Sequence, residues 1–185
     1  MSKIAIVFHS GRGHTRKVAE SVAFGCGGSL LEIDSEGCIG DSMWQCLAES
    51  DAIIFGSPTY MGGPSWQFKK FADTSSKPWV TQAWKDKISA GFTNSASING
   101  DKGSTIQSLF TLSQQHGMIW VGMGMKASNN KTATREDINN LGGYAGLLTT
   151  TPSDATIDEM IPGDLATAGA FGRRVFDIVA HWSRK

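Results

Sequence analysis

The sequence lacks an excess of charge of either sign. Its 185 residues include 17 Lys and Arg and 17 Asp and Glu, so the formal net charge at pH 7 is zero. Proteins that bind nucleic acids or anionic membrane surfaces usually carry a basic excess, because phosphate-rich partners attract positive patches. The charge balance therefore gives no electrostatic argument for a nucleic acid or a membrane surface as a partner.

The sequence also lacks long hydrophobic runs and any pattern of cysteines. The first apolar run, which begins at Ile4, is far too short for a signal sequence or a membrane span. Cys26, Cys38 and Cys46 are odd in number and do not have the spacing of a metal site. We interpret them as free thiols in a reducing cytoplasm, and we expect no metal and no membrane span.

What the sequence does contain is a regular alternation of strand and helix patterns. Apolar runs predict strands over 3–8, 29–34, 51–57 and 86–94 and from 118, and helical spacing predicts helices over 14–25, 41–49, 65–75, 103–116 and 163–182. This alternation is typical of a doubly wound α/β sheet with helices on both faces, here as one domain over 1–185. The Gly/Asn/Thr-rich segment 124–152 is too long for an ordinary connection, so we expect it to be functional or to form a partner surface.

Three of the predicted strands end in polar loops. Ser10–Thr15 follow the first strand, Ser57–Gly63 follow the third, and Thr93–Gly100 follow the fourth. Ligands of open α/β sheets bind outside the carboxyl ends of the strands. Because these ends lie at one edge of a parallel sheet, we expect the three loops to form one site.

The first loop, "SGRGHT", leads into a helix N-terminus, where free N–H groups and the helix dipole favour an anion. Ser10 and Thr15 add hydroxyl donors, and the glycines allow the backbone to approach a ligand closely. A phosphate monoester fits this composition, and so does an ordinary turn with a capping side chain. Both interpretations stay open on the loop alone.

Two common nucleotide-binding motifs are absent or incomplete. The pattern GxxxxGK[ST] does not occur, which argues against a P-loop NTPase. The stretch "GRGHTR" begins like GxGxxG but has Arg16 at the third glycine position, while Asp34 stands where a ribose-binding acid would. A dinucleotide fold is therefore an alternative, weaker than a mononucleotide site.

The second and third loops suit a flat heterocycle with a polar edge. Tyr60, beside Met61 and two glycines, stands at a loop tip where an aromatic ring can cover a planar ligand. Thr93, Asn94 and Ser95 offer hydroxyl and amide groups to the edge of such a ring or to a ribityl chain. A phosphate site flanked by these two loops describes flavin mononucleotide (FMN).

Three stretches, "HSGRGHT" (9–15), "DAIIFGSPTYMGG" (51–63) and "QQHGM" (114–118), together resemble the flavodoxin-like NAD(P)H:quinone oxidoreductases of the tryptophan-repressor-binding-protein type. The similarity extends from Lys3 through "GGYAGLL" (142–148) to the last predicted helix. The resemblance implies a flavodoxin-like three-layer sandwich, with a five-stranded parallel sheet in the order 2-1-3-4-5.

The resemblance also implies which residues contact FMN. In the family, the loop matching 10–15 holds the phosphate, the loop matching 58–62 lines the isoalloxazine, and the loop matching 93–96 contacts its other edge. The residues assigned in this way are Ser10, Arg12, Gly13, His14, Thr15, Pro58, Thr59, Tyr60, Met61, Gly62, Thr93, Asn94, Ser95 and Ala96. For His14 we expect the backbone N–H to make the contact, and Arg12 either pairs with the phosphate or points to solvent.

The family typically forms tetramers whose active sites include residues of neighbouring subunits, which implies a homodimer or homotetramer here. His116 matches a histidine at that site, Trp79 matches a tryptophan contributed by a neighbour, and Tyr144 falls where an aromatic lies near the pocket. We assign His116 as the catalytic residue, either bonding the quinone oxygen or supplying a proton. The alternative is structural, because a histidine at a helix end can satisfy the last carbonyls.

The implied function is an FMN-dependent NAD(P)H:quinone oxidoreductase, in which the flavin carries the chemistry and the protein positions it. One pocket used first by the nicotinamide and then by the quinone implies a ping-pong mechanism that transfers two electrons. The alternative is a flavodoxin-type carrier of single electrons. Such carriers are usually strongly acidic, so the neutral net charge favours the enzyme.

Overall fold

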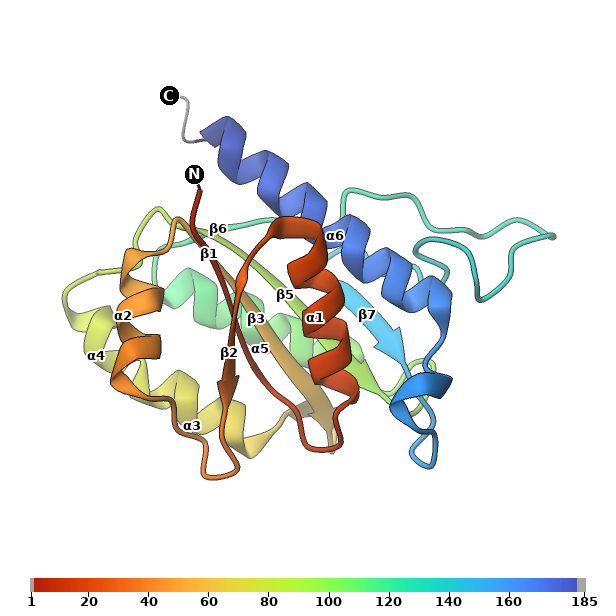
Figure 1. The fold of residues 1–185 in the computed structure, drawn as a ribbon, viewed down its shortest axis with the longest axis horizontal. Coiled ribbons are helices and arrows are strands. Elements are labelled where there is room, and N and C mark those ends of the chain that lie inside the picture. The colour runs from red at the N-terminus through yellow and green to blue at the C-terminus, as the bar shows by residue number, and fades with distance from the viewer. Residues whose placement is uncertain (1, 183–185) are drawn as a thin grey trace.

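The buried apolar runs of the sequence form one twisted sheet, which Figure 1 shows for the computed structural model of residues 2–182. Its parallel strands are β1 (Ile4–His9), β2 (Ser29–Ile33), β3 (Ala52–Tyr60), β5 (Ile88–Ser95) and β6 (Ile119–Trp120), in the order β2-β1-β3-β5-β6. A two-residue strand, β4 (Gly63–Pro64), pairs antiparallel with the end of β3. The order confirms the predicted arrangement 2-1-3-4-5.

The last position of the sheet is occupied by two short strands instead of one. β6 pairs with the start of β5 at Ile88 and Ser89, and β7 (Leu147–Thr150) pairs with its end, from Phe92 to Ser95. Residues 121–146 leave the sheet between them and extend beyond it as an excursion, drawn in teal in Figure 1. The prediction of a strand running from 118 through "MIWVGM" was therefore wrong after Trp120, and 147–150, placed in the Gly/Asn/Thr-rich segment, is a strand.

Hydrogen bonds at the base of the excursion explain why β6 and β7 stay aligned along β5 although 26 residues separate them. The Met123 N–H donates to the Tyr144 carbonyl over 2.9 Å, and Trp120 Nε1 donates to the Ala145 carbonyl over 2.7 Å. The outgoing and returning chains are therefore joined where they leave the sheet, and β7 continues the line of β6.

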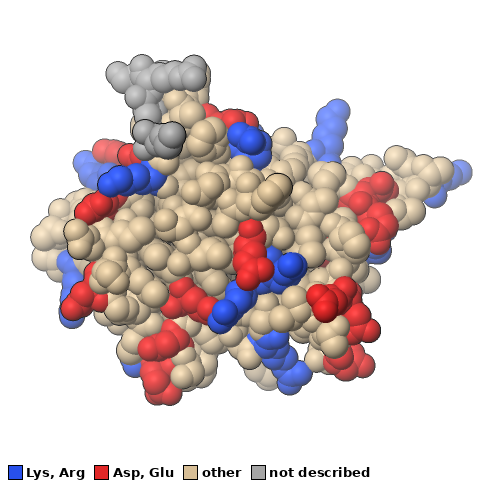
Figure 2. Space-filling model, viewed as in Figure 1, with Lys and Arg blue, Asp and Glu red and all other residues tan. Residues whose placement is uncertain are grey.

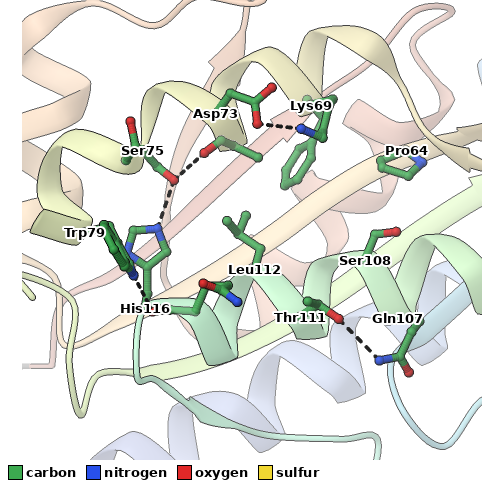
Figure 3. Close-up of a pocket in the computed structure, with 14 residues that line it drawn as sticks. Pro64, Lys69, Asp73, Ser75, Trp79, Gln107, Ser108, Thr111, Leu112 and His116 are labelled. Atoms are coloured by element: carbon green, nitrogen blue, oxygen red, sulfur yellow. Dashed lines mark hydrogen bonds and ion pairs between the residues drawn. The ribbon is translucent and has the colours of Figure 1, made fainter.

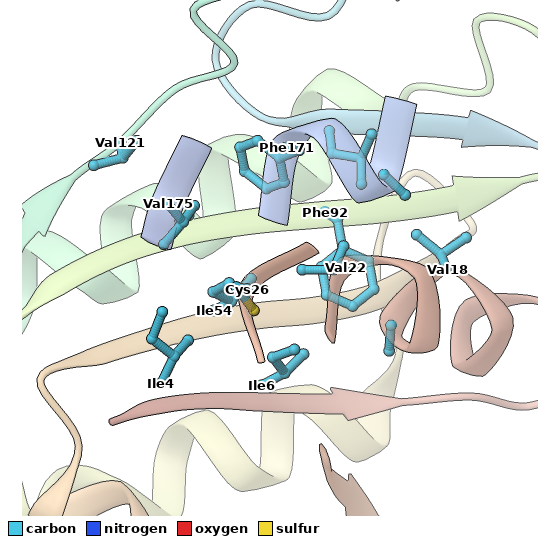
Figure 4. Close-up of a cluster of buried hydrophobic side chains, with 14 of the residues drawn as sticks. Ile4, Ile6, Val18, Val22, Cys26, Ile54, Phe92, Val121, Phe171 and Val175 are labelled. Carbon is cyan, nitrogen blue, oxygen red and sulfur yellow. The ribbon is translucent and has the colours of Figure 1, made fainter. Parts of the chain in front are cut away.

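Helices cover both faces of the sheet. On one face lie α1 (His14–Cys26) and α6 (Pro162–Trp182), and on the other lie α2 (Asp41–Glu49), α3 (Trp66–Thr74), α4 (Ser76–Val80) and α5 (Lys102–Gln115). Alternate residues of β1 serve the two cores: Ile4 and Ile6 face α1 and α6, while Ala5 and Val7 face the other layer. Figure 4 shows the first core, in which Val22 of α1 and Phe171 of α6 belong to one cluster with Ile6 and Phe92 of the sheet.

The predicted helices agree with the observed ones to within one residue at each end. The short elements α4, β4 and a 3₁₀ turn over Ile157–Glu159 had no predicted counterpart. Among residues 2–182, no helix combines the length and the hydropathy that crossing a bilayer requires.

Candidate functional site

The three polar loops predicted to form one site do meet at the carboxyl edge of the sheet. They line a cavity of about 260 Å³, here called the carboxyl-edge cavity. A fourth wall comes from the chain that follows β7. The lining residues are Arg12, His14, Thr15, Pro58, Thr59, Tyr60, Asn94, Ser95, Ala96, Thr151 and Ser153.

The first loop presents unused backbone donors at the start of α1. Ser10 Oγ accepts the N–H groups of Gly13 and Arg16, each over 3.1 Å, and so caps part of the helix N-terminus. The N–H groups of Arg12, His14 and Thr15 have no acceptor within residues 2–182, and the Thr15 hydroxyl, which lines the cavity, has none there either. Free amides at the positive end of a helix dipole form an anion site.

The side chains of Arg12 and His14 bind backbone carbonyls of the segment that follows β7. Arg12 Nη1 donates to the Ser153 carbonyl and His14 Nε2 donates to the Ala155 carbonyl, both over 2.9 Å. These two bonds hold the segment after β7 against the first loop. The structure thus uses both side chains to build the cavity wall, and the pairing of the Arg12 guanidinium with a phosphate stays a prediction.

In the second loop, Pro58, Thr59 and Tyr60 line the cavity and the two following residues do not. The Tyr60 hydroxyl lies against Gly11, so its half-exposed ring bridges the first and second loops. Met61 is fully exposed. Gly62 has a φ of +79°, a conformation that residues with a side chain rarely adopt. Gly62 therefore shapes the turn, and neither residue reaches the cavity within one chain.

In the third loop, Thr93 lies beneath the cavity instead of in its lining. Thr93 is fully buried, and its hydroxyl pairs over 2.8 Å with that of Thr59, which in turn donates to Thr105. Asn94, Ser95 and Ala96 do line the cavity.

The fourth wall was not predicted from the sequence, because 149–152 was placed in the Gly/Asn/Thr-rich segment 124–152 and not in a strand. Thr149 and Thr151 donate to Asn94 Oδ1 over 2.9 and 3.0 Å. Thr150, on the other side of the strand, accepts a hydrogen bond of 2.9 Å from Lys102 Nζ, and its N–H donates to Asp164 over 2.7 Å. Three consecutive threonines directly after two leucines were the available signal, since they mark another strand that ends in polar residues.

Lys102 connects the third loop to this wall. Its side chain is 1% exposed, and Nζ donates to the carbonyls of Ser97 and Ile98 as well as to Thr150. Burial lowers the pKa of Lys102 to about 8, and the nearby Asp164 carboxylate opposes that shift. The amine thus fixes the loop that carries Ser95 and Ala96.

His116 and Trp79 lie away from the carboxyl-edge cavity. They line a groove of about 770 Å³ between α3, α4 and α5, shown in Figure 3. Lys102 starts α5 beside the third loop, and His116 follows the other end of this helix, which is 14 residues or about 20 Å long. Within one chain, the structure therefore does not bring His116 to the cavity.

The His116 ring is held by a contact to another part of the chain, and no hydrogen bond from this ring to the last carbonyls of α5, which the structural alternative assumed, is present among residues 2–182. The ring is 2% exposed, and Nε2 donates over 2.9 Å to Ser75 Oγ, whose own proton goes to the Ala72 carbonyl (Figure 3). Burial lowers the pKa of His116 to about 4, so the ring is neutral at pH 7. Its catalytic role stays a prediction that needs an approach by another chain.

Trp79 and Tyr144 are both accessible at the surface. Trp79 is 44% exposed, and its Nε1 donates to the Gln115 carbonyl over 2.9 Å. Tyr144 is 61% exposed and lines a separate pocket with Trp120 and the start of α5. Neither contacts the carboxyl-edge cavity, so their predicted place near an active site also requires a second copy.

Comparisons with known proteins agree with this geometry. Residues 42–133 match the family model of NADPH-dependent FMN reductases. The chain is 49% identical over 175 residues to the flavodoxin FldP of Pseudomonas aeruginosa, covering 95% of both chains. It is 34% identical over 147 residues to an NAD(P)H dehydrogenase (quinone) of Trichlorobacter lovleyi, covering 66% of this chain and 72% of the relative.

A solved structure shows the same likeness in three dimensions. The flavodoxin, WrbA-like protein from Agrobacterium tumefaciens superposes with a TM-score of 0.82 at 45% sequence identity, covering 98% of this chain and 99% of that one. The likeness therefore includes both the fold and nearly half of the residues, over the whole length of the chain.

Proposed function

The chain belongs to the WrbA-type, flavodoxin-like family that includes NAD(P)H:quinone oxidoreductases, and on this premise we propose that it is an FMN-dependent oxidoreductase that takes electrons from NAD(P)H. The proposed acceptor is a quinone. Bound FMN would supply the hydride and electron-transfer chemistry between the nicotinamide and the acceptor. The protein contributes the site, the orientation and the access.

The observation that carries this proposal is the set of unused donors in the first loop. A phosphate monoester is a dianion at neutral pH, and three N–H groups that have no acceptor among residues 2–182, those of Arg12, His14 and Thr15, lie at the start of α1. The Thr15 hydroxyl adds a fourth donor. The remaining walls offer the Tyr60 ring and the Asn94 amide, which suit an aromatic ligand with a polar edge. The residues present therefore fit FMN.

The same cavity explains the proposed order of events. The first loop would hold the phosphate, and the second and third loops would flank the ring. We propose that the nicotinamide and the quinone both reach the flavin through this cavity and use it in turn, which gives ping-pong kinetics. Initial rates with NADH or NADPH and benzoquinone should give parallel double-reciprocal lines, and convergent lines would contradict a shared pocket.

Binding of FMN and of riboflavin to the apoprotein tests the site directly. Riboflavin lacks the phosphate, so FMN should bind more tightly. Thr15→Val removes a hydrogen bond to a charged group, which should weaken FMN roughly tenfold and leave riboflavin unchanged. The control is Thr111→Val on the exposed face of α5, which should alter neither affinity. Equal affinities of wild type for the two flavins would refute the phosphate site.

A single-electron carrier is the second candidate, because the relative at 49% identity is named a flavodoxin. The charge distribution favours the enzyme: the net charge is zero, and the face in Figure 2 carries acidic and basic side chains interspersed instead of one acidic field. A redox titration separates the two candidates. The enzyme should reduce in one two-electron step, and a carrier in two resolved one-electron steps.

We further propose that the protein is a cytoplasmic homo-oligomer. Its three cysteines are all unpaired, as suits a reducing compartment. Trp66, Trp79 and Val80 expose large apolar side chains on the layer that contains the α3–α5 groove. Burial of these side chains against a second copy would bring that copy's residues close to the groove, and light scattering after gel filtration measures the assembly.

A further inference from the structure

The Asn94 side chain lines the cavity with an amide whose oxygen is hydrogen-bonded and whose nitrogen, among the described residues, is not. Its Oδ1 accepts hydrogen bonds from Thr149 Oγ1 and Thr151 Oγ1, over 2.9 and 3.0 Å. Its Nδ2 has no acceptor within residues 2–182, although the residue is only 5% exposed. Nδ2 is not completely shielded from solvent. The open space beside Asn94 is the carboxyl-edge cavity.

Thr151 fixes which end of the amide faces the cavity, with Thr149 beside it, since the Thr149 hydroxyl also has the Thr93 carbonyl as an acceptor over 3.3 Å. Thr149 belongs to β7 and Thr151 directly follows the last residue of that strand, so the two side chains, two residues apart, project from the same side toward Asn94. Thr149 is fully buried and Thr151 is 2% exposed. If the amide were reversed, the Thr151 hydroxyl proton would have no acceptor among the described residues, and a buried donor without a partner is costly. The amide therefore presents two N–H donors, and no acceptor, to the cavity.

We propose that Thr149 and Thr151 are positioning residues that hold the Asn94 amide as a fixed donor to the bound flavin and thereby favour its reduced form. This inference rests on the proposed binding of FMN. The pyrimidine part of an isoalloxazine carries carbonyl oxygens and ring nitrogens that accept hydrogen bonds, and it becomes richer in electrons on reduction. A donor already in place strengthens as that charge develops.

The test is the midpoint potential of the bound flavin, measured beside the affinity of oxidised FMN. Asn94→Leu removes the donor, and the double variant Thr149→Val with Thr151→Val removes the two hydroxyls while preserving side-chain shape. Both should weaken binding of reduced FMN roughly tenfold relative to oxidised FMN. For a two-electron couple this ratio lowers the midpoint potential by about 30 mV. The control, Thr149→Ser with Thr151→Ser, keeps both hydroxyls and should keep the wild-type potential.

The serine control distinguishes positioning from simple packing. A potential that falls with Asn94→Leu but stays at the wild-type value in the double valine variant would overturn the role of the threonines. An equal fall in the serine and valine variants would also overturn it, because packing would then be the cause. If the double valine variant does not fold, Thr151→Val alone replaces it, with a smaller fall expected and an unchanged potential as the refutation. Failure of the wild-type apoprotein to bind FMN would instead refute the proposed function.

Discussion

The contact between α1 and α6 allows a single methyl group to test how the anion site is held. Gly172 of α6 faces the backbone of α1: a Cβ built there overlaps the Val22 carbonyl oxygen and lies 3.0 Å from its carbon. Backbone cannot swing aside as a flexible side chain would, so Gly172→Ala must push the helices apart. Because the obstacle is rigid backbone, the overpacking cost falls in the upper part of its usual range, about 2–3 kcal/mol, and the better helix propensity of alanine returns about 1 kcal/mol. We expect a net loss of about 1–2 kcal/mol in the free energy of unfolding.

Gly169 provides the matched control one turn earlier on the same helix. A Cβ there would meet only the Ser21 carbonyl oxygen at 3.7 Å, an ordinary contact. Gly169→Ala should therefore raise the melting temperature by about 2–4 °C, whereas Gly172→Ala should lower it by about 2–8 °C. Since α1 begins at the anion site, Gly172→Ala should also weaken FMN binding. Calorimetry of both variants checks the pair, and a Gly172→Ala protein as stable as wild type would refute the reasoning.

Two further predictions concern buried charge. The pKa of His116 in the folded protein, about 4, lies below its ordinary value of 6.5. Between these pH values the unfolded chain therefore binds a proton that the folded chain does not. The free energy of unfolding should fall by up to about 3 kcal/mol as the pH falls through this range. His116→Phe should flatten this dependence, measured by urea unfolding at about pH 7 and about pH 4.5. The slope that remains has other sources: burial lowers the pKa of His9 and raises that of Asp164, and hydrogen bonds lower the pKa values of Glu49 and Glu159. An unchanged slope would contradict the assignment. Arg135 Nη2 binds both carboxylate oxygens of Asp164, which is 4% exposed, so Arg135→Met should lower the free energy of unfolding in urea by about 2–4 kcal/mol. Arg12→Met loses only a hydrogen bond to a carbonyl and should cost less. Equal losses would show that the ion pair adds no stability.

The parts of the fold and site that could be predicted from sequence share a local cause. Apolar runs that end in small polar residues mark parallel strands, and the carboxyl ends of such strands meet whatever the rest of the chain does. This physical constraint brought the loops of Thr15, Pro58 and Asn94 together in one cavity.

The parts that could not be predicted depend on partners that local pattern does not reveal. β7 has only four residues and lies 26 residues beyond β6, so it has neither the length nor the position that the alternation of elements suggests. The direction of the Arg12 side chain depends on the Ser153 carbonyl, far away in the chain, and no feature of the first loop encodes it. The environment of His116 depends on Ser75 in the same way.

The carboxyl-edge cavity takes its walls from both ends of the chain. Arg12 and Ser153 face each other across 141 positions of sequence, and hydrogen bonds from the side chains of Arg12 and His14 join the two segments there. A cofactor bound between them would act as a noncovalent cross-link that closes a loop of 141 sequence positions. By mass action, such a ligand at a hundred times its dissociation constant adds about 2.7 kcal/mol to the folded state. Supply of the cofactor thereby becomes a determinant of how long the protein survives in the cell.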